Sequence, residues 1–169
     1  KLQRRYSELE VEMKIAGSER DRLGYCPLKR IFEAGREAER FDPEVVVMSC
    51  AFQDISSFSS EPTICELYGI MLNHLIACSR AKIILVTPPP YPFRAEESKV
   101  LTIILQKIAL RHNVAVADLF RAVMLSEGDW RRLFLDDAAR DDVYNLHLNT
   151  AGQEIIANTI LRAIVKDTG

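Results

Sequence analysis

Two kinds of hydrophobic pattern follow one another along the chain. Three short runs of consecutive apolar residues, many of them β-branched, are typical of strands covered on both faces in a parallel sheet, and they span 45–48, 83–86 and 114–117. Near the N-terminus, residues 8–15 alternate between charged and apolar side chains, which predicts a half-exposed edge strand. The chain therefore contains candidate strands well separated in sequence.

Between these runs the apolar residues recur at helical spacing, so helices connect the strands. The spacing predicts helices over about 27–41, 62–79 and 96–112, a shorter helical stretch after 118, and a last helix that Asn149 or Thr150 can cap. Three prolines at 88–90 stop the second buried strand, because proline has no N–H to donate to a ladder. Strand alternating with helix predicts an α/β fold with a parallel sheet and right-handed crossovers.

Composition limits the range of functions. With 169 residues, of which 48% are hydrophobic, the chain is expected to form one domain over 1–169. A net charge of -2 gives no electrostatic reason to expect a nucleic-acid or anionic-membrane partner, so we expect a small-molecule substrate. No apolar run approaches the ~20 residues that a membrane span needs.

The four cysteines contain no C-x-x-C pair, so neither a metal site nor a disulfide framework is predicted, and no cofactor is expected. The first six residues are not typical of a signal peptide, and our working expectation is a cytoplasmic protein.

The candidate chemistry centres on His147, which directly precedes the start of the last helix. Histidine is the usual carrier of proton transfer near neutral pH. In an open parallel sheet, ligands bind beyond the carboxyl ends of the strands, which here are the loops at 17–18, at 49–54 and at the three prolines. If His147 is functional, its loop has to lie near these.

Three stretches carry a resemblance to the SGNH (GDSL-type) hydrolases, which are serine esterases and lipases. His147-Leu148-Asn149-Thr150-Ala151-Gly152 resembles the family's histidine block with its Leu-Asn-x-x-Gly continuation, and Ala51-Phe52-Gln53-Asp54 resembles its G-x-N-D block. Gly17 is similar to the glycine of its second block. The resemblance implies a flavodoxin-like three-layer α/β/α sandwich and hydrolysis of carboxylic esters, with an acylated sugar or a short-chain ester as substrate.

The resemblance also implies roles for particular residues. His147 would be the general base, and the Gly17 N–H and the Gln53 side-chain amide would donate to the oxyanion. The family's acid lies three positions before the histidine, where this chain has Tyr144. Asp142 is therefore the first candidate for the acid that orients His147, with Asp141 as the second.

The family's first block, G-D-S with its nucleophilic serine, would lie upstream of Lys1 on a strand at the centre of the sheet. We therefore expect an upstream segment, or another chain, to complete the sheet and supply the nucleophile. Ser18 and Cys50 are weaker substitutes. The departures from the pattern at Ala51, Gln53 and Tyr144 keep open an alternative, a catalytically inactive scaffold or binding module on the same fold.

One apolar cluster late in the chain allows two interpretations. Trp130, Leu133, Phe134 and Leu135 can be core packing or an apolar flap over an acyl pocket, and the sequence favours packing.

Overall fold

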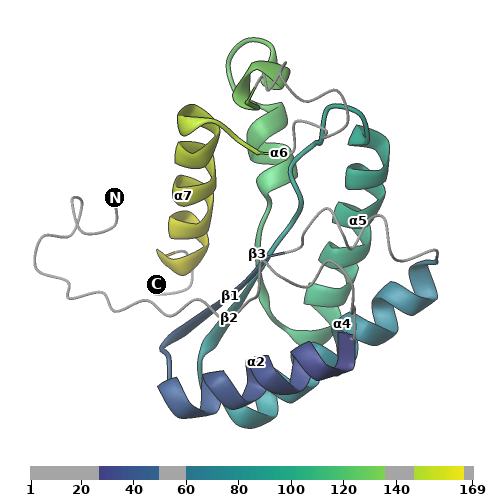
Figure 1. The fold of residues 1–169 in the computed structure, drawn as a ribbon, viewed down its shortest axis with the longest axis vertical. Coiled ribbons are helices and arrows are strands. Elements are labelled where there is room, and N and C mark those ends of the chain that lie inside the picture. The colour runs from purple at the N-terminus through teal and green to yellow at the C-terminus, as the bar shows by residue number, and fades with distance from the viewer. Residues whose placement is uncertain (1–26, 50–59, 136–146, 166–169) are drawn as a thin grey trace, which may run out of the picture.

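The computed structural model describes residues 27–49, 60–135 and 147–165, which form helices around a small sheet (Figure 1). The elements are α2 (Pro27–Phe41), β1 (Val45–Ser49), α4 (Glu61–Cys78), β2 (Lys82–Val86), α5 (Ala95–His112), β3 (Ala115–Ala117), α6 (Leu119–Met124), the 3-10 helix η1 (Trp130–Leu133) and α7 (Thr150–Val165). These elements confirm the predicted alternation of strands and helices. The predicted strand at 8–15 lies outside the described residues.

The three strands form a parallel sheet in the order β1-β2-β3. In its register Val47 lies beside Ile84, and Leu85 lies beside Val116. Parallel neighbours need a crossover between them, and α4 and α5 supply the two crossovers. The predicted parallel α/β fold is confirmed.

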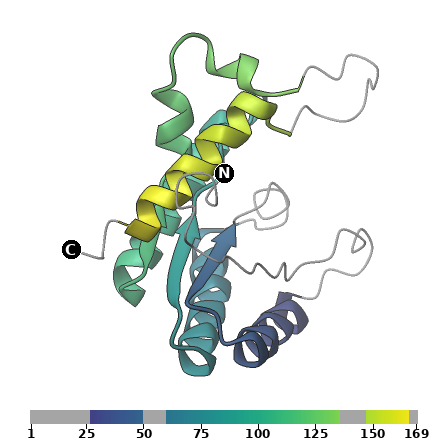
Figure 2. The same cartoon turned by 90° about the vertical axis from the view of Figure 1, so that its left-hand side faces the viewer.

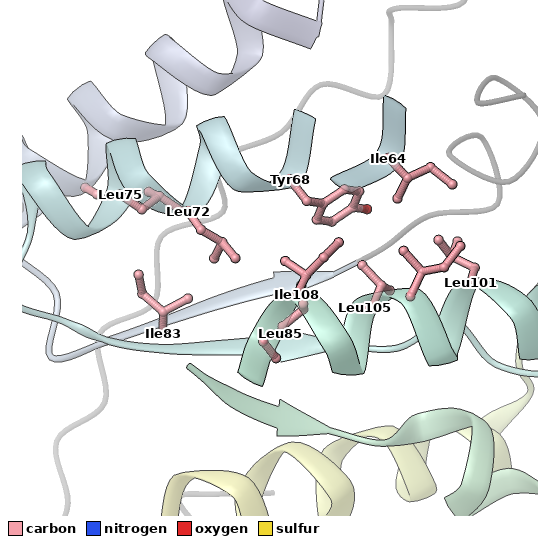
Figure 3. Close-up of a cluster of buried hydrophobic side chains, with 12 residues drawn as sticks. Ile64, Tyr68, Leu72, Leu75, Ile83, Leu85, Leu101, Leu105 and Ile108 are labelled. Carbon is pink, nitrogen blue, oxygen red and sulfur yellow. The ribbon is translucent and has the colours of Figure 1, made fainter. Parts of the chain in front are cut away.

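Each face of the sheet is covered by helices because side chains of β2 alternate between two clusters. Ile83 and Leu85 pack with α4 and α5, and Figure 3 shows these side chains meeting between the helices and the strands. Ile84 and Val86 point the other way and pack with residues of α6 and α7. The outer helices α2 and α7 lie well apart in both views (Figure 1, Figure 2). The arrangement is the expected three-layer sandwich.

β1 departs from the prediction that its apolar run is covered on both faces. Val47 is 43% exposed, whereas Ile84 beside it on β2 is fully buried. The difference has a simple cause: among the described residues β1 lies at the edge of the sheet, and α7 packs mainly against β2 and β3. Within the described residues, therefore, the prediction does not hold for Val47.

The long helices begin and end as their sequences indicate. Ser60 precedes α4 and its hydroxyl accepts the N–H of Thr63, as an N-cap does. Asn113 ends α5 in the left-handed conformation with φ 52°, which asparagine tolerates better than most residues. No helix within the described ranges is both long and apolar enough to cross a membrane.

Candidate functional site

His147 is held by a short antiparallel pairing with the segment that follows η1. The Leu135 N–H donates to the carbonyl oxygen of His147 at 2.8 Å, and the Asn149 N–H donates to that of Leu133 at 2.8 Å. Phe134 and Leu148 form the bridge between these two bonds. The backbone on both sides of the histidine is therefore fixed, while its side chain stays exposed.

Asn149 ties this pairing to the start of α7. Its side-chain oxygen accepts the N–H of Gly152 at 3.1 Å, and its side-chain nitrogen donates to the carbonyl oxygen of Arg132 at 2.7 Å. Of the two predicted caps, Asn149 is the residue that precedes the helix and caps it. One side chain thus satisfies an otherwise unpaired helix donor and holds the neighbouring segment in place.

Gly152 allows α7 to approach the paired segments closely. A Cβ at this position would lie 2.8 Å from the carbonyl oxygen of Leu133 and 2.8 Å from the Cβ of Leu148. Both distances are shorter than van der Waals contact, so any side chain here would push α7 away. Each of the leucine, asparagine and glycine in the Leu-Asn-x-x-Gly run therefore has a structural task that serves the position of His147.

The inner side of the pairing is a small apolar cluster of Tyr91, Phe134 and Leu148. The rings of Tyr91 and Phe134 lie 6.3 Å apart, and Trp130 meets Phe134 edge-on at 6.1 Å. Since Tyr91 follows the three prolines, this cluster joins the His147 segment to the turn after β2. The prediction of packing is confirmed for Phe134, whereas Leu135 is 49% exposed and stays outside the cluster.

A polar network centred on the buried Thr87 holds the carboxyl ends of β2 and β3 together. The Thr87 hydroxyl accepts the Phe120 N–H at 3.1 Å and donates to Oδ1 of Asp118 at 3.5 Å. Asp118 also accepts the Arg121 N–H at 2.9 Å and the side-chain amide of Gln106 at 2.9 Å. One signal in the sequence points to this network, a polar residue directly after each of two buried strands.

The other two histidines lie away from this pairing, in contacts between helices. His74 of α4 occupies the space beside Gly35 of α2, so that a Cβ on Gly35 would collide with the imidazole. His112 lies in the last turn of α5, with its Nε2 3.6 Å from where a Cβ on Gly69 would be. Both positions indicate packing rather than chemistry.

Comparison with known proteins identifies the fold family. The model of the GDSL-like lipase/acylhydrolase family matches residues 1–155. The chain belongs to the GDSL-like lipase/acylhydrolase family. No curated protein sequence matched it.

Solved structures with the same fold include esterases. The crystal structure of TesA superposes with a TM-score of 0.60 at 14% identity, covering 83% of this chain and 73% of that one. A carbohydrate esterase family 3 protein from Talaromyces cellulolyticus gives 0.60 at 20% identity, with coverages of 82% and 69%. Axe2, an acetylxylan esterase from Geobacillus stearothermophilus, gives 0.55 at 18% identity, with coverages of 83% and 68%. These likenesses establish the fold.

Of the GDSL-like site residues expected from sequence, the structure describes His147. Gly17, Gln53 and Asp142 lie outside the described residues, as do Asp141, Ser18 and Cys50. Within the described ranges, no three His, Cys, Asp or Glu side chains come together in a way that could hold a metal ion. The described part of the site is thus an exposed imidazole on a rigid backbone, joined to the turn after β2.

Proposed function

We propose that this chain acts as a carboxylic ester hydrolase of the serine type, with His147 as the general base. Membership of the GDSL-like lipase/acylhydrolase family supports the reaction class. The observation that carries the proposal is the fixed backbone on both sides of an exposed His147, joined through Leu148 and Tyr91 to the turn after β2. A histidine on a fixed backbone, with its imidazole accessible, is available for proton transfer to a bound substrate.

The proposed reaction is acyl transfer. His147 removes the proton from a serine hydroxyl that attacks the ester carbonyl, and it later returns that proton to the leaving alcohol. The Gly17 N–H and the Gln53 amide donate to the oxyanion, with each donor contributing about 3 kcal/mol of transition-state stabilisation. The substrate is an acylated sugar or a short-chain ester. The acetylxylan esterase among the structural neighbours supports the first of these.

The nucleophile in this proposal comes from a segment outside these 169 residues, either upstream or on another chain. The open edge of β1 supports this idea. Among the described residues β1 pairs with β2 alone, and Val47 remains 43% exposed. An unpaired edge of a parallel strand leaves backbone donors and acceptors available for another strand.

Hydrolysis of p-nitrophenyl acetate by the full-length protein tests the proposal. We expect His147→Ala to lower the rate at least about 10³-fold, since the serine then has no base. His112→Ala, at the end of α5, is the matched control and should keep the wild-type rate. Equal rates for the wild type and His147→Ala would contradict the assignment.

A binding module without catalysis is the second candidate, favoured by the departures from the family pattern at Ala51, Gln53 and Tyr144. It predicts a full-length protein that binds an ester or an acylated sugar and leaves it intact. Hydrolysis that depends on His147 would exclude this candidate.

A further inference from the structure

Leu135 is a large apolar side chain that lies beside His147 without joining the core. It is 49% exposed, whereas the preceding residue, Phe134, is buried in the cluster with Tyr91 and Leu148. Its own N–H donates to the carbonyl oxygen of His147 at 2.8 Å, which holds its backbone beside that of the histidine. Among the described residues, Leu135 belongs to none of the buried apolar clusters.

The register of the pairing places the side chains of Leu135 and His147 on the same face. Phe134 and Leu148 oppose each other and both point inward. Successive side chains of paired strands alternate between the two faces, so the next pair, Leu135 and His147, points outward. Directly opposite side chains in an antiparallel pair have Cβ atoms about 5 Å apart. The observed exposure of both residues agrees with this placement.

The proton transfers of the histidine indicate which part of an ester substrate lies next to Leu135. In acyl transfer, the histidine that deprotonates the serine also protonates the oxygen of the leaving alcohol. The alcohol therefore lies next to the imidazole, whereas the carbonyl oxygen points toward the oxyanion donors. A side chain that shares the outward face with His147 is placed to contact the alcohol rather than the acyl chain.

We propose that Leu135 contacts the leaving alcohol of the ester and makes the enzyme prefer an apolar alcohol. This inference rests on the proposed function and narrows its substrate class. Between the two substrates considered, it favours a short-chain ester of an apolar alcohol over an acylated sugar, because a sugar offers the leucine much less apolar surface.

Two substrate series tested on the full-length protein separate the alcohol from the acyl group. In the first, ethyl acetate is compared with hexyl acetate, so that only the alcohol changes. In the second, p-nitrophenyl acetate is compared with p-nitrophenyl hexanoate, so that only the acyl chain changes. We expect Leu135→Ser to lower the hexyl-to-ethyl ratio of kcat/KM by about tenfold and to leave the acyl ratio unchanged.

Two further variants serve as controls. Leu125→Ser removes another exposed leucine, at the C-terminal end of α6, and should change neither ratio. Leu135→Met keeps an apolar side chain of similar volume and should keep the wild-type preference.

The outcomes distinguish this inference from the proposed function. A wild-type protein that hydrolyses ethyl acetate through His147, with an alcohol ratio that Leu135→Ser leaves unchanged, would overturn the inference alone. A fall of both ratios to the same extent would also overturn it, since that indicates general damage to the site. A wild-type protein that hydrolyses none of the four esters would overturn the proposed function, and this inference with it.

Discussion

At the scale of single residues, the Leu-Asn-x-x-Gly run holds the backbone next to His147 in place. Asn149 caps α7 and holds the Arg132 carbonyl, while Gly152 leaves room for the Leu133 carbonyl. Neither residue needs to touch a substrate. They fix the backbone beside His147, and the proposed role of His147 as the base requires such a fixed position.

Gly152→Ala is expected to lower the free energy of unfolding by about 1–3 kcal/mol, because the new Cβ meets a backbone carbonyl that cannot easily shift. Urea denaturation measures the change. Gly69→Ala, inside α4, is the matched control. Its Cβ would meet His112 at an ordinary contact distance of 3.6 Å, and helix propensity then makes the change neutral or stabilising by up to about 1 kcal/mol. Equal destabilisation by both variants would contradict the close approach seen at Gly152.

The acid that orients His147 is expected to be Asp142, so Asp142→Asn should lower kcat about 10²- to 10⁴-fold while substrate binding changes little. Asp141→Asn is the first comparison. Asp136→Asn and Asp137→Asn, at the two positions that follow Leu135 in the sequence, are two further comparisons. A full rate in Asp142→Asn, with a loss in one of the other variants, would reassign the role.

At the scale of elements, the turn after β2 is rigid because three neighbouring elements share one polar network. Thr87 ends β2, Asp118 follows β3 and caps α6, and Gln106 reaches Asp118 from α5. The prolines that follow Thr87 are buried and have no N–H to satisfy. The turn is thereby a fixed support for Tyr91, and through Tyr91 for the segment that carries His147.

Thr87→Val should lower the free energy of unfolding by about 1–3 kcal/mol, because the part-buried Phe120 N–H and the Asp118 carboxylate both lose a partner. The shift in the urea midpoint, at an unchanged slope, measures it. Thr159→Val in α7 provides the control. It removes a hydroxyl bonded to the Ile155 carbonyl of its own helix, and we expect less than about 0.5 kcal/mol. A Thr87 variant as stable as the Thr159 variant would argue against the network.

At the scale of the whole molecule, the described sheet is well covered in its middle and open at β1. α4 and α5 cover one face and α6 and α7 cover β2 and β3 on the other, as Figure 1 and Figure 3 show. Val47 faces the same side as Ile84 and yet is 43% exposed. If another segment completes the sheet, as we propose, Val47 becomes buried in the full-length protein.

Val47→Asp in the full-length protein is expected to destabilise it by about 3 kcal/mol or more, because a completed sheet would bury the carboxylate without a partner. Thermal and urea denaturation measure the loss. Val100→Asp is the control, since Val100 lies 56% exposed on α5 and valine and aspartate have similar helix propensity. If both variants lose the same small amount of stability, nothing covers β1 in the full-length protein.

For the described residues, the sequence alone determined the strands, the long helices and their order. The apolar runs of the strands and the helical spacing between them follow from local periodicity, so the ranges expected for α2, α4, β2 and α5 agree with those observed to within one or two residues. The histidine block was also visible from sequence, because a cap and a glycine at fixed spacing are local features.

The tertiary structure decided what depends on contacts between distant segments. Periodicity indicates that Val47 is apolar, but only the position of β1 at the edge of the described sheet explains its exposure. In the same way, sequence could not distinguish Phe134 from Leu135, since both are large and apolar. The pairing of Phe134 with Leu148 decides between them: Phe134 packs into the core, and Leu135 lies on the outer face with His147. Which face a side chain takes is fixed only once the two segments pair.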